Sequence, residues 1–266
     1  PPGVPAGVGT STLAAHLAVL ARQARARAQG EALQQDGLLM ELAQPSGDLA
    51  LYLNLDSRFH YEDALRNASR IDATLARTAM ARHDSGLVLL DRASGCDAVP
   101  PSDPGALLQR LRGVFASVLC DAGGCPLRQL PPLLLDQADE IWLVTDASIA
   151  TLVSLDQALK HLAGQREREK RLQLVINRHD DSSGMSPEQI ARRFEVPLLA
   201  TLPERPRVRL AASQGHLLLQ DAPRDPYLRA LAPLVSRLDP AACPVQPHGL
   251  RERLSLALGG SQWKTR

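Results

Sequence analysis

Short, almost uninterrupted apolar runs recur along this chain, and the stretches between them carry apolar residues at helical spacing. The runs 86–91 (Gly-Leu-Val-Leu-Leu-Asp) and 140–145 (Glu-Ile-Trp-Leu-Val-Thr) show the pattern clearly. Strands that are apolar on both faces need cover on both faces, and helices between successive strands make those strands parallel. We therefore predict one α/β domain with a doubly wound, mostly parallel sheet flanked by helices.

The pattern also predicts where the elements lie. Strands are expected at residues 37–43, 86–91, 115–121, 140–145, 172–176 and 197–202. Helices are expected at residues 13–29, 49–53, 71–82, 130–138, 150–162, 186–194, 207–214 and 226–238, with another ending near 112 and a solvated turn at 166–171. Ligands of such sheets bind outside the carboxyl ends of the strands. The polar residues expected at those ends are Glu41, Asp91, Asp121, Thr145 and Asn177.

A glycine-containing loop, residues 5–12 (Pro-Ala-Gly-Val-Gly-Thr-Ser-Thr), runs directly into the first predicted helix. Gly7 and Gly9 have no Cβ to block a phosphate, and the backbone N–H groups there and at the helix start can face an anion. A P-loop adds a lysine on the terminal phosphates and a Ser/Thr hydroxyl on Mg²⁺. Ser11 and Thr12 meet the second requirement, but Thr10 occupies the lysine position.

A P-loop ordinarily follows a buried strand, whereas only Pro-Pro-Gly-Val precedes this loop. Two explanations stay open: a first strand is lost from the gene as read, or the site has decayed. The rival interpretation of the loop itself is a glycine-rich turn that starts a helix.

Composition excludes several classes of protein. The formal net charge is +1, so nothing draws the chain as a whole to nucleic acid or to an anionic membrane. No apolar run approaches the ~20 residues that span a bilayer. The four cysteines (Cys96, Cys120, Cys125, Cys243) lack metal-ligand spacing, and the histidines are scattered. We expect a cytoplasmic protein with reduced thiols.

The loop 7–12, Asp121 after its apolar run, and Asn177-Arg178 together resemble the MinD/ParA-like P-loop ATPases with a deviant Walker A motif. The resemblance narrows to the TadZ/CpaE-type proteins of Flp (Tad) pilus assembly. The stretches similar to that branch are residues 44–53, 79–87, 140–146, 177–180 and 202–228. The similarity implies a degenerate ATPase domain over residues 1–238, a loosely ordered tail over residues 239–266, and no receiver-like domain ahead of them.

The resemblance implies roles for named residues. The backbone of Gly7, Val8, Gly9 and Thr10 would cradle the phosphates of ATP or ADP, Ser11 would reach Mg²⁺, and Thr12 would touch the α-phosphate. Asp121 would hold the Mg²⁺ shell as the Walker B carboxylate. Asn177, Arg178 and Pro203 would lie at the adenine. For Asp121 a turn-capping role, and for Asn177 a role in capping the strand end, are the alternatives.

The sequence departs from the family pattern at three charged positions. Pro5 and Thr10 replace the two lysines of the Walker A motif, and Glu41-Leu-Ala replaces the Asp-x-Asp pair that positions water. Glu41 is left as either an inherited acid near the phosphates or a solvated residue of no consequence. Since phosphoryl transfer depends on positioning and charge neutralisation, these losses act on hydrolysis before they act on binding. Each lost stabiliser costs ~10²–10³ in rate.

We therefore predict a factor for assembly and localisation of a Tad/Flp pilus, which uses the ATPase fold as a dimerising scaffold with ATP and Mg²⁺ as weak or structural ligands. Its expected partners are a second copy of the chain and pilus secretion proteins such as the secretion ATPase. Specific nucleic-acid binding is not expected, and membrane or polar location would be indirect, because the amphipathic stretch 250–258 holds only two cations. The alternative is a slow MinD/ParA-type ATPase that cycles between monomer and ATP-bound dimer. The basic run 205–209 is either a contact for phosphate or nucleic acid or, as we expect, a solvated loop face.

Overall fold

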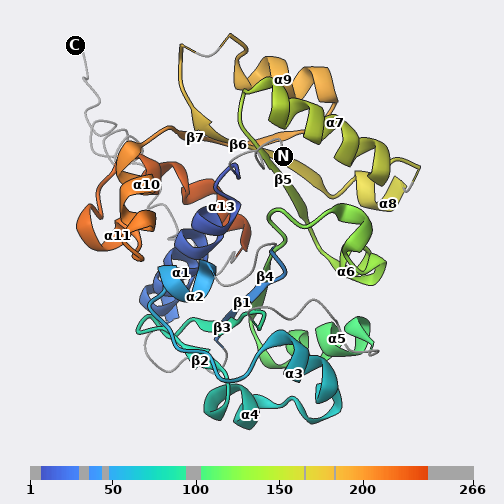
Figure 1. Cartoon of the computed structure of the whole chain (residues 1–266), viewed down its shortest axis with the longest axis vertical. Helices are drawn as coiled ribbons and strands as arrows, with labels where there is room; N and C mark the ends of the chain where they lie inside the picture. Colours follow the sequence, from blue (N-terminus) through green and yellow to red (C-terminus); the bar gives the residue numbers. More distant parts are fainter. Residues whose placement is uncertain are drawn as a thin grey trace, which may run out of the picture.

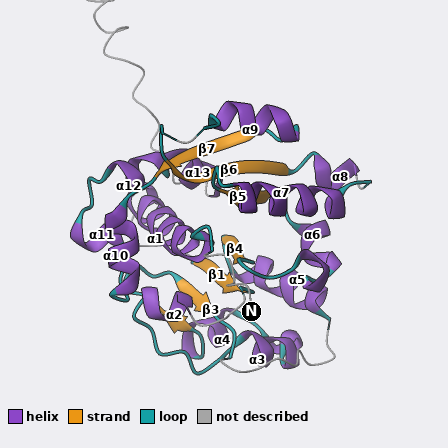
Figure 2. Ribbon diagram, turned by 45° about the horizontal axis from the view of Figure 1, so that its top comes forward, coloured by secondary structure: helices purple, strands orange, loops and turns teal. Residues whose placement is uncertain are grey.

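The structure is a computed structural model that describes residues 7–29, 36–43, 48–93, 103–164, 166–182 and 184–238. It confirms the predicted fold class: mostly parallel strands lie between layers of helices (Figures 1 and 2). The strands are β1 Gly37–Glu41, β2 Ala81–Arg82, β3 Val88–Leu90, β4 Ser117–Asp121, β5 Ile141–Thr145, β6 Leu172–His179 and β7 Leu198–Pro203.

The longer helices are α1 Thr10–Gln29, α5 Pro104–Val114, α7 Ile149–Leu162, α9 Pro187–Phe194, α10 Pro206–Ser213 and α13 Ala232–Leu238. The shorter helices are α2 Asp48–Tyr52, α3 Tyr61–Arg66, α4 Ala73–Thr78, α6 Pro132–Gln137, α8 Arg166–Glu169, α11 Leu218–Asp221 and α12 Pro226–Ala230, with single 3₁₀ turns at Ala68–Arg70 and Leu127–Gln129. Among the described helices, none combines the length and hydropathy needed to cross a bilayer.

Within the described residues the strands form two hydrogen-bonded sheets rather than one. One sheet has the order β2-β3-β1-β4 and the other the order β5-β6-β7. All strand pairs are parallel except β2 with β3. β4 and β5 are therefore edge strands, one in each sheet.

The side chains of each strand alternate between two helical layers. In β1, Leu38 and Met40 pack with α3, α5 and α6, whereas Leu39 between them packs against α1. In β6, Leu174 and Ile176 join the first layer, and Val175 joins the core beneath α1, α12 and α13. Figure 1 shows α1 and α13 on the opposite side of the strands from α5 and α6. This alternation explains why the strand sequences are apolar throughout.

Several element boundaries differ from those predicted. The stretch 71–82 contains the short helix α4 and then β2, because Arg82 pairs with Val88 and its Nη1 lies 2.8 Å from Asp36 Oδ2. The predicted turn at 166–171 contains α8, which Arg168 anchors through an Nε–Asp136 Oδ1 contact of 2.6 Å. β6 runs on to His179, since its end pairs with Pro203 of β7. The tail 239–266 lies outside the described residues.

Candidate functional site

The glycine loop lies at the carboxyl ends of strands from both sheets and passes straight into α1. Its first helical hydrogen bond runs from the Leu13 N–H to the Gly9 carbonyl, at 2.9 Å. The side-chain amide Nδ2 of Asn177, at the end of β6, donates to the Val8 carbonyl at 2.7 Å. A buried side chain 169 residues away along the chain thus fixes the loop. Asn177 is therefore an anchor of the loop, a role that the sequence did not predict, and its role at the adenine stays a prediction.

Gly9 and Gly7 differ in what surrounds them. Gly9 has φ +81°, and a Cβ built on it would lie 3.0 Å from Asn177 Nδ2. Among the described residues, no heavy atom lies within 4 Å of the corresponding position on Gly7. The outer face of the loop at Gly7 is therefore open, as an approaching phosphate requires, while the inner face at Gly9 is closely packed.

Because Gly9 is closely packed and Gly7 is not, alanine substitutions at the two positions should change the free energy of unfolding by different amounts. Gly9→Ala should lower the free energy of unfolding by ~1–2 kcal/mol, because alanine disfavours this φ and would push Asn177 off Val8. Gly7→Ala should change stability by less than ~0.5 kcal/mol. Urea unfolding of both variants measures this, and equal losses would contradict the loop packing.

A cavity of about 320 Å³ opens beside the loop and collects most of the predicted nucleotide residues. Gly9, Thr12, Asn177, Arg178 and Pro203 all line it. Its other lining residues are Tyr52, Glu204, Arg205, Val208, Arg209, Ala212, Ser213 and Tyr227. The volume lies within the range of small-molecule pockets, and the mixture of apolar walls with a few cations suits an anionic ligand.

Arg178 is the cation nearest to the loop. It follows Asn177 with φ +52°, a left-handed conformation that is uncommon for arginine. Its Nη2 and Nε lie 3.4 and 3.6 Å from the position of a Gly9 Cβ, so the guanidinium lies against the loop. Burial alone would raise the pKa of Asp146, but hydrogen bonds from Thr151 and Ser148, with the charge of Arg178, hold that pKa below its ordinary value.

The other two arginines of the cavity are paired with carboxylates. Arg205 Nη2 lies 3.2 Å from Asp225 Oδ2, and Arg209 Nη2 lies 2.6 Å from Glu204 Oε1. Arg178 has no such ion pair within the described part of the chain. It is therefore the cation in the wall whose charge is least compensated.

The His16 side chain ties the first turn of α1 to the start of α11. Its ring is fully buried, its Nδ1 donates to the Thr12 carbonyl at 2.7 Å, and its Nε2 accepts from the Leu218 N–H at 2.9 Å. Burial lowers the pKa of His16 to about 4, although the hydrogen bond to Thr12 opposes the shift. The neutral ring is thus a structural tie that sequence inspection did not find.

The two strand-end acids, Glu41 and Asp121, are neighbours, and each contacts a backbone N–H group. Glu41 and Asp121 pair in register at the ends of β1 and β4, and both are buried. Asp121 Oδ1 accepts from the Gly123 N–H at 2.9 Å, which is the turn-capping arrangement. Glu41 lies 3.4 Å from the Leu49 N–H, at the start of α2.

Asp91 and Thr145 do not join the candidate site. Asp91 Oδ1 lies 3.0 Å from His60 Nδ1, so it supports the start of α3. The Thr145 hydroxyl donates to the Asp146 carbonyl at 3.1 Å. Only Asn177 among the predicted strand-end residues therefore lines the cavity beside the loop.

The residues present fit a Mg²⁺–nucleotide in part. The described residues hold no cluster of three or more His, Cys, Asp or Glu that could bind a metal alone. Mg²⁺ in nucleotide sites takes one or two protein oxygens and otherwise phosphate and water, and Ser11 with Asp121 would supply those oxygens. A Cβ on Gly123 would lie 3.1 Å from both Asp121 Oδ1 and the Thr10 Cβ, so the helix start packs on the Asp121 turn.

The prediction missed Tyr52, Glu204, Tyr227 and the cavity-facing position of Arg205 and Arg209. The basic run 205–209 was a detectable signal, and two of its arginines line the cavity. Nothing in the sequence marks Tyr52 or Tyr227, which reach the cavity from α2 and α12. Pro5 lies outside the described residues.

No protein-family profile and no curated protein matches the chain. Solved structures do match it over most of its length. A ParA family ATPase from Chlorobium tepidum superposes with a TM-score of 0.73 at 20% identity, covering 85% of this chain and 91% of that one. The septum site-determining protein MinD from Pyrococcus horikoshii, in complex with Mg-ADP, gives 0.65 at 23% identity, covering 88% and 91%.

The MinC:MinD cell division protein complex from Aquifex aeolicus gives a TM-score of 0.66 at 20% identity, covering 91% of this chain and 96% of that one. Superpositions at identities this low show a shared fold and nothing more. That fold agrees with the loop-to-helix transition and the strand-end residues described above. The chain thus has the P-loop NTPase fold of the ParA and MinD ATPases.

Proposed function

We propose that the chain is a MinD/ParA-like nucleotide-binding scaffold with turnover close to zero, which acts in assembly and localisation of a Tad/Flp pilus. The observation that carries the nucleotide part is the cavity beside Gly9, with Arg178, the cation of its wall that forms no ion pair with a described residue, lying against a loop whose backbone is open at Gly7. ATP or ADP with Mg²⁺ is the proposed ligand. Its phosphates lie against residues 7–12, and its base lies toward Pro203 and Tyr227.

In this proposal, the guanidinium of Arg178 supplies the positive charge that a lysine at position 10 would otherwise provide. A guanidinium that contacts a phosphate contributes ~1.5–3 kcal/mol, which corresponds to ~10-fold or more in affinity. Arg178→Ala should therefore raise the Kd for Mg-ATP at least ~10-fold. Arg207→Ala is the matched control, because Arg207 belongs to the basic run but does not line the cavity. Calorimetric titration measures both, and equal affinities for the two variants would contradict the role of Arg178.

We expect low turnover because the site lacks the lysines of the Walker A motif. Neither Thr10 nor Pro5 supplies a cation, and Asp121 and Glu41 contact backbone N–H groups. Steady-state ATP hydrolysis should not exceed that of the Ser11→Ala/Asp121→Ala double variant. Hydrolysis clearly above that control would favour instead the slow ATPase that cycles between monomer and dimer.

A scaffold needs partner surfaces, and we propose a homodimer together with pilus secretion proteins such as the secretion ATPase. On α7, Ile149 and Val153 stand one turn apart and are 82% and 52% exposed. Exposed apolar side chains on one helical face are typical of contact surfaces. Sedimentation with and without Mg-ATP tests whether the dimer depends on nucleotide, and the presence of prepilin and secretion ATPase genes beside this gene tests the pathway.

A further inference from the structure

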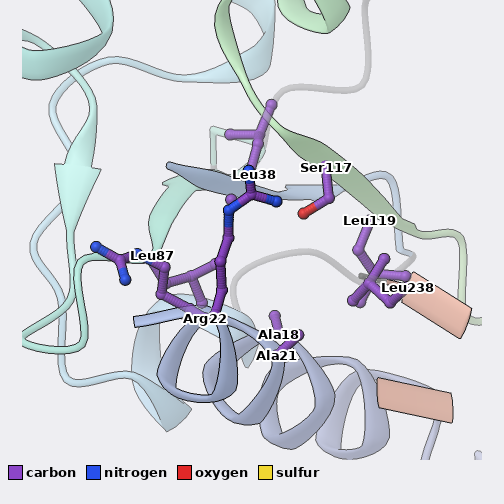
Figure 3. Close-up of a pocket in the computed structure, with 10 residues that line it drawn as sticks. Ala18, Ala21, Arg22, Leu38, Leu87, Ser117, Leu119 and Leu238 are labelled. Carbon is purple, nitrogen blue, oxygen red and sulfur yellow. The ribbon is translucent and has the colours of Figure 1, made fainter. Parts of the chain in front are cut away.

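A small cavity lies between α1 and the amino ends of β1 and β4 (Figure 3). It measures about 10 Å³, which is room for one particle of the size of a water molecule. Its polar side chains are Arg22 and Arg25 of α1 and Ser117, the first residue of β4. The other described lining residues are alanines, a glycine and leucines, so none of them is a carboxylate. We call this space the Arg22 cavity.

The Arg22 guanidinium is buried and lacks most of its hydrogen bonds. The side chain is 12% exposed, and both Nε and Nη1 are buried without a hydrogen-bond partner among the described residues. Nη2 faces a carboxylate oxygen, Asp36 Oδ1, at 3.5 Å. Buried polar side-chain atoms in folded proteins are nearly always paired with protein, water or an ion. The two unpaired nitrogens therefore indicate that a ligand completes this cavity.

The positive charge of Arg22 is only partly compensated by Asp36. Asp36 is shared with a second arginine, because its Oδ2 lies 2.8 Å from Arg82 Nη1, a shorter contact than the one to Arg22. Two arginines and one carboxylate leave one positive charge in excess. A water molecule accepts a hydrogen bond from Arg22 but leaves that charge in place, whereas an anion supplies both the acceptor and the opposite charge.

Packing holds the guanidinium in position. Gly86 has φ +83°, and a Cβ built on it would lie 2.7 Å from Arg22 Nη2 and 3.1 Å from Cζ, so the guanidinium lies directly against the Gly86 backbone. Figure 3 shows the Arg22 side chain extending from α1 toward Leu38 and Ser117. The Ser117 hydroxyl lines the same cavity and can donate a further hydrogen bond. The donors are thus arranged before a ligand enters.

We propose that the Arg22 cavity binds one monatomic, monovalent anion of the chloride class, held by the N–H groups of Arg22 with the hydroxyl of Ser117 as a further donor. A cavity of about 10 Å³ has no room for phosphate, sulfate or an organic carboxylate. The ion ties α1 to the amino ends of β1 and β4. Arg22 lies ~18 Å along α1 from Thr10, so the site is remote from the glycine loop and the proposal is independent of nucleotide binding.

Thermal unfolding of the full chain at constant ionic strength tests the proposal, with sodium gluconate exchanged stepwise for sodium chloride. Gluconate is too large for the cavity, so Tm should rise by ~3 °C and level off as chloride saturates the folded state. Arg22→Met keeps the apolar stem and should lose most of this gain, and Ser117→Ala should lose part of it. Arg27→Met, an exposed arginine of the same helix, is the matched control and should keep the gain.

The glycine loop is the rival place for an anion, and a further variant separates the two sites. Arg178→Ala removes the cation beside the loop and leaves the Arg22 cavity intact, so its Tm should respond to chloride as the parent does. A response that Arg178→Ala loses and Arg22→Met keeps would place the anion at the loop and would overturn the proposal. Equal gains in the parent, Arg22→Met and Ser117→Ala would overturn it too.

Crystals of the full chain soaked in sodium bromide locate the ion directly, because bromide scatters X-rays anomalously. The expected result is an anomalous peak in the Arg22 cavity, within hydrogen-bond distance of the guanidinium. A water molecule there with no anomalous peak would contradict the proposal, even if Arg22→Met fails to fold. A bromide peak without any dependence of Tm on chloride would mean binding at crystal concentration only, which also contradicts it.

Discussion

Replacing Thr10 by lysine should tighten the binding of Mg-ATP ~10- to 100-fold. Thr10 opens α1 directly after Gly9, the position from which a P-loop lysine reaches the terminal phosphates. In the proposed site the backbone of the loop already faces the phosphates, so the substitution adds a charge without needing a change of fold. Thr10→Gln is the matched control, because it supplies a long polar side chain without the charge.

The same substitution also tests whether Arg178 serves as the substitute cation. If both cations act on the phosphates, the Thr10→Lys/Arg178→Ala double variant should regain the affinity that Arg178→Ala loses. Calorimetric Kd values for the four proteins form a double-mutant cycle. No gain from Thr10→Lys over Thr10→Gln would mean that the phosphates do not lie at the start of α1.

Acidification from pH 6.5 to 4 should destabilise the protein through His16. The folded-state pKa of His16 is about 4, against 6.5 for an exposed histidine, so between these values the unfolded chain takes up a proton that the folded chain does not. Stability is therefore complete above pH 6.5 and falls as the pH decreases toward 4. The difference at pH 4 amounts to ~3 kcal/mol.

The physical cause is burial of the ring, which disfavours the charged form, while the hydrogen bond from Nδ1 to the Thr12 carbonyl acts in the opposite direction. A proton on Nε2 would place an N–H against the Leu218 N–H, which now donates to that nitrogen. His16→Gln should flatten the dependence of the unfolding free energy on pH between 6.5 and 4, even if the variant is less stable throughout. His161→Gln, an exposed histidine on α7, is the control and should keep the slope of the parent. An unchanged slope in His16→Gln would contradict this account.

Local sequence patterns predict much of this fold, because a continuous apolar run indicates a strand that is covered on both faces of the sheet. The continuous apolar runs at 37–43, 115–121 and 140–145 correspond to β1, β4 and β5. The glycine loop was likewise detectable, since glycines followed by hydroxyl residues at a helix start are a local signature. Two residues of that signature, Gly9 and Thr12, line one cavity with Asn177, Arg178 and Pro203, which the family resemblance predicted.

Contacts between segments that are far apart in the chain could not be predicted from the sequence. Nothing near Asn177 in sequence indicates that its amide binds Val8, or that Arg178 turns back toward Gly9. The separation of the strands into two sheets is a matter of strand order, which depends on neighbours far apart in the chain. Glu41 shows the same limit: the sequence places an acid at the end of a strand, but it does not indicate that the carboxylate contacts the Leu49 N–H at the start of α2.

The central claim is that a backbone cradle for a polyphosphate persists here without the lysines that support cleavage. Backbone amide NMR of the full chain during addition of Mg-ADP tests it directly. The account predicts saturable shifts that are largest for the amides of Gly7, Gly9 and Ser11, with smaller shifts at Asn177 and Arg178. Saturating Mg-ADP that leaves these amides unmoved, or that shifts amides elsewhere instead, would contradict it.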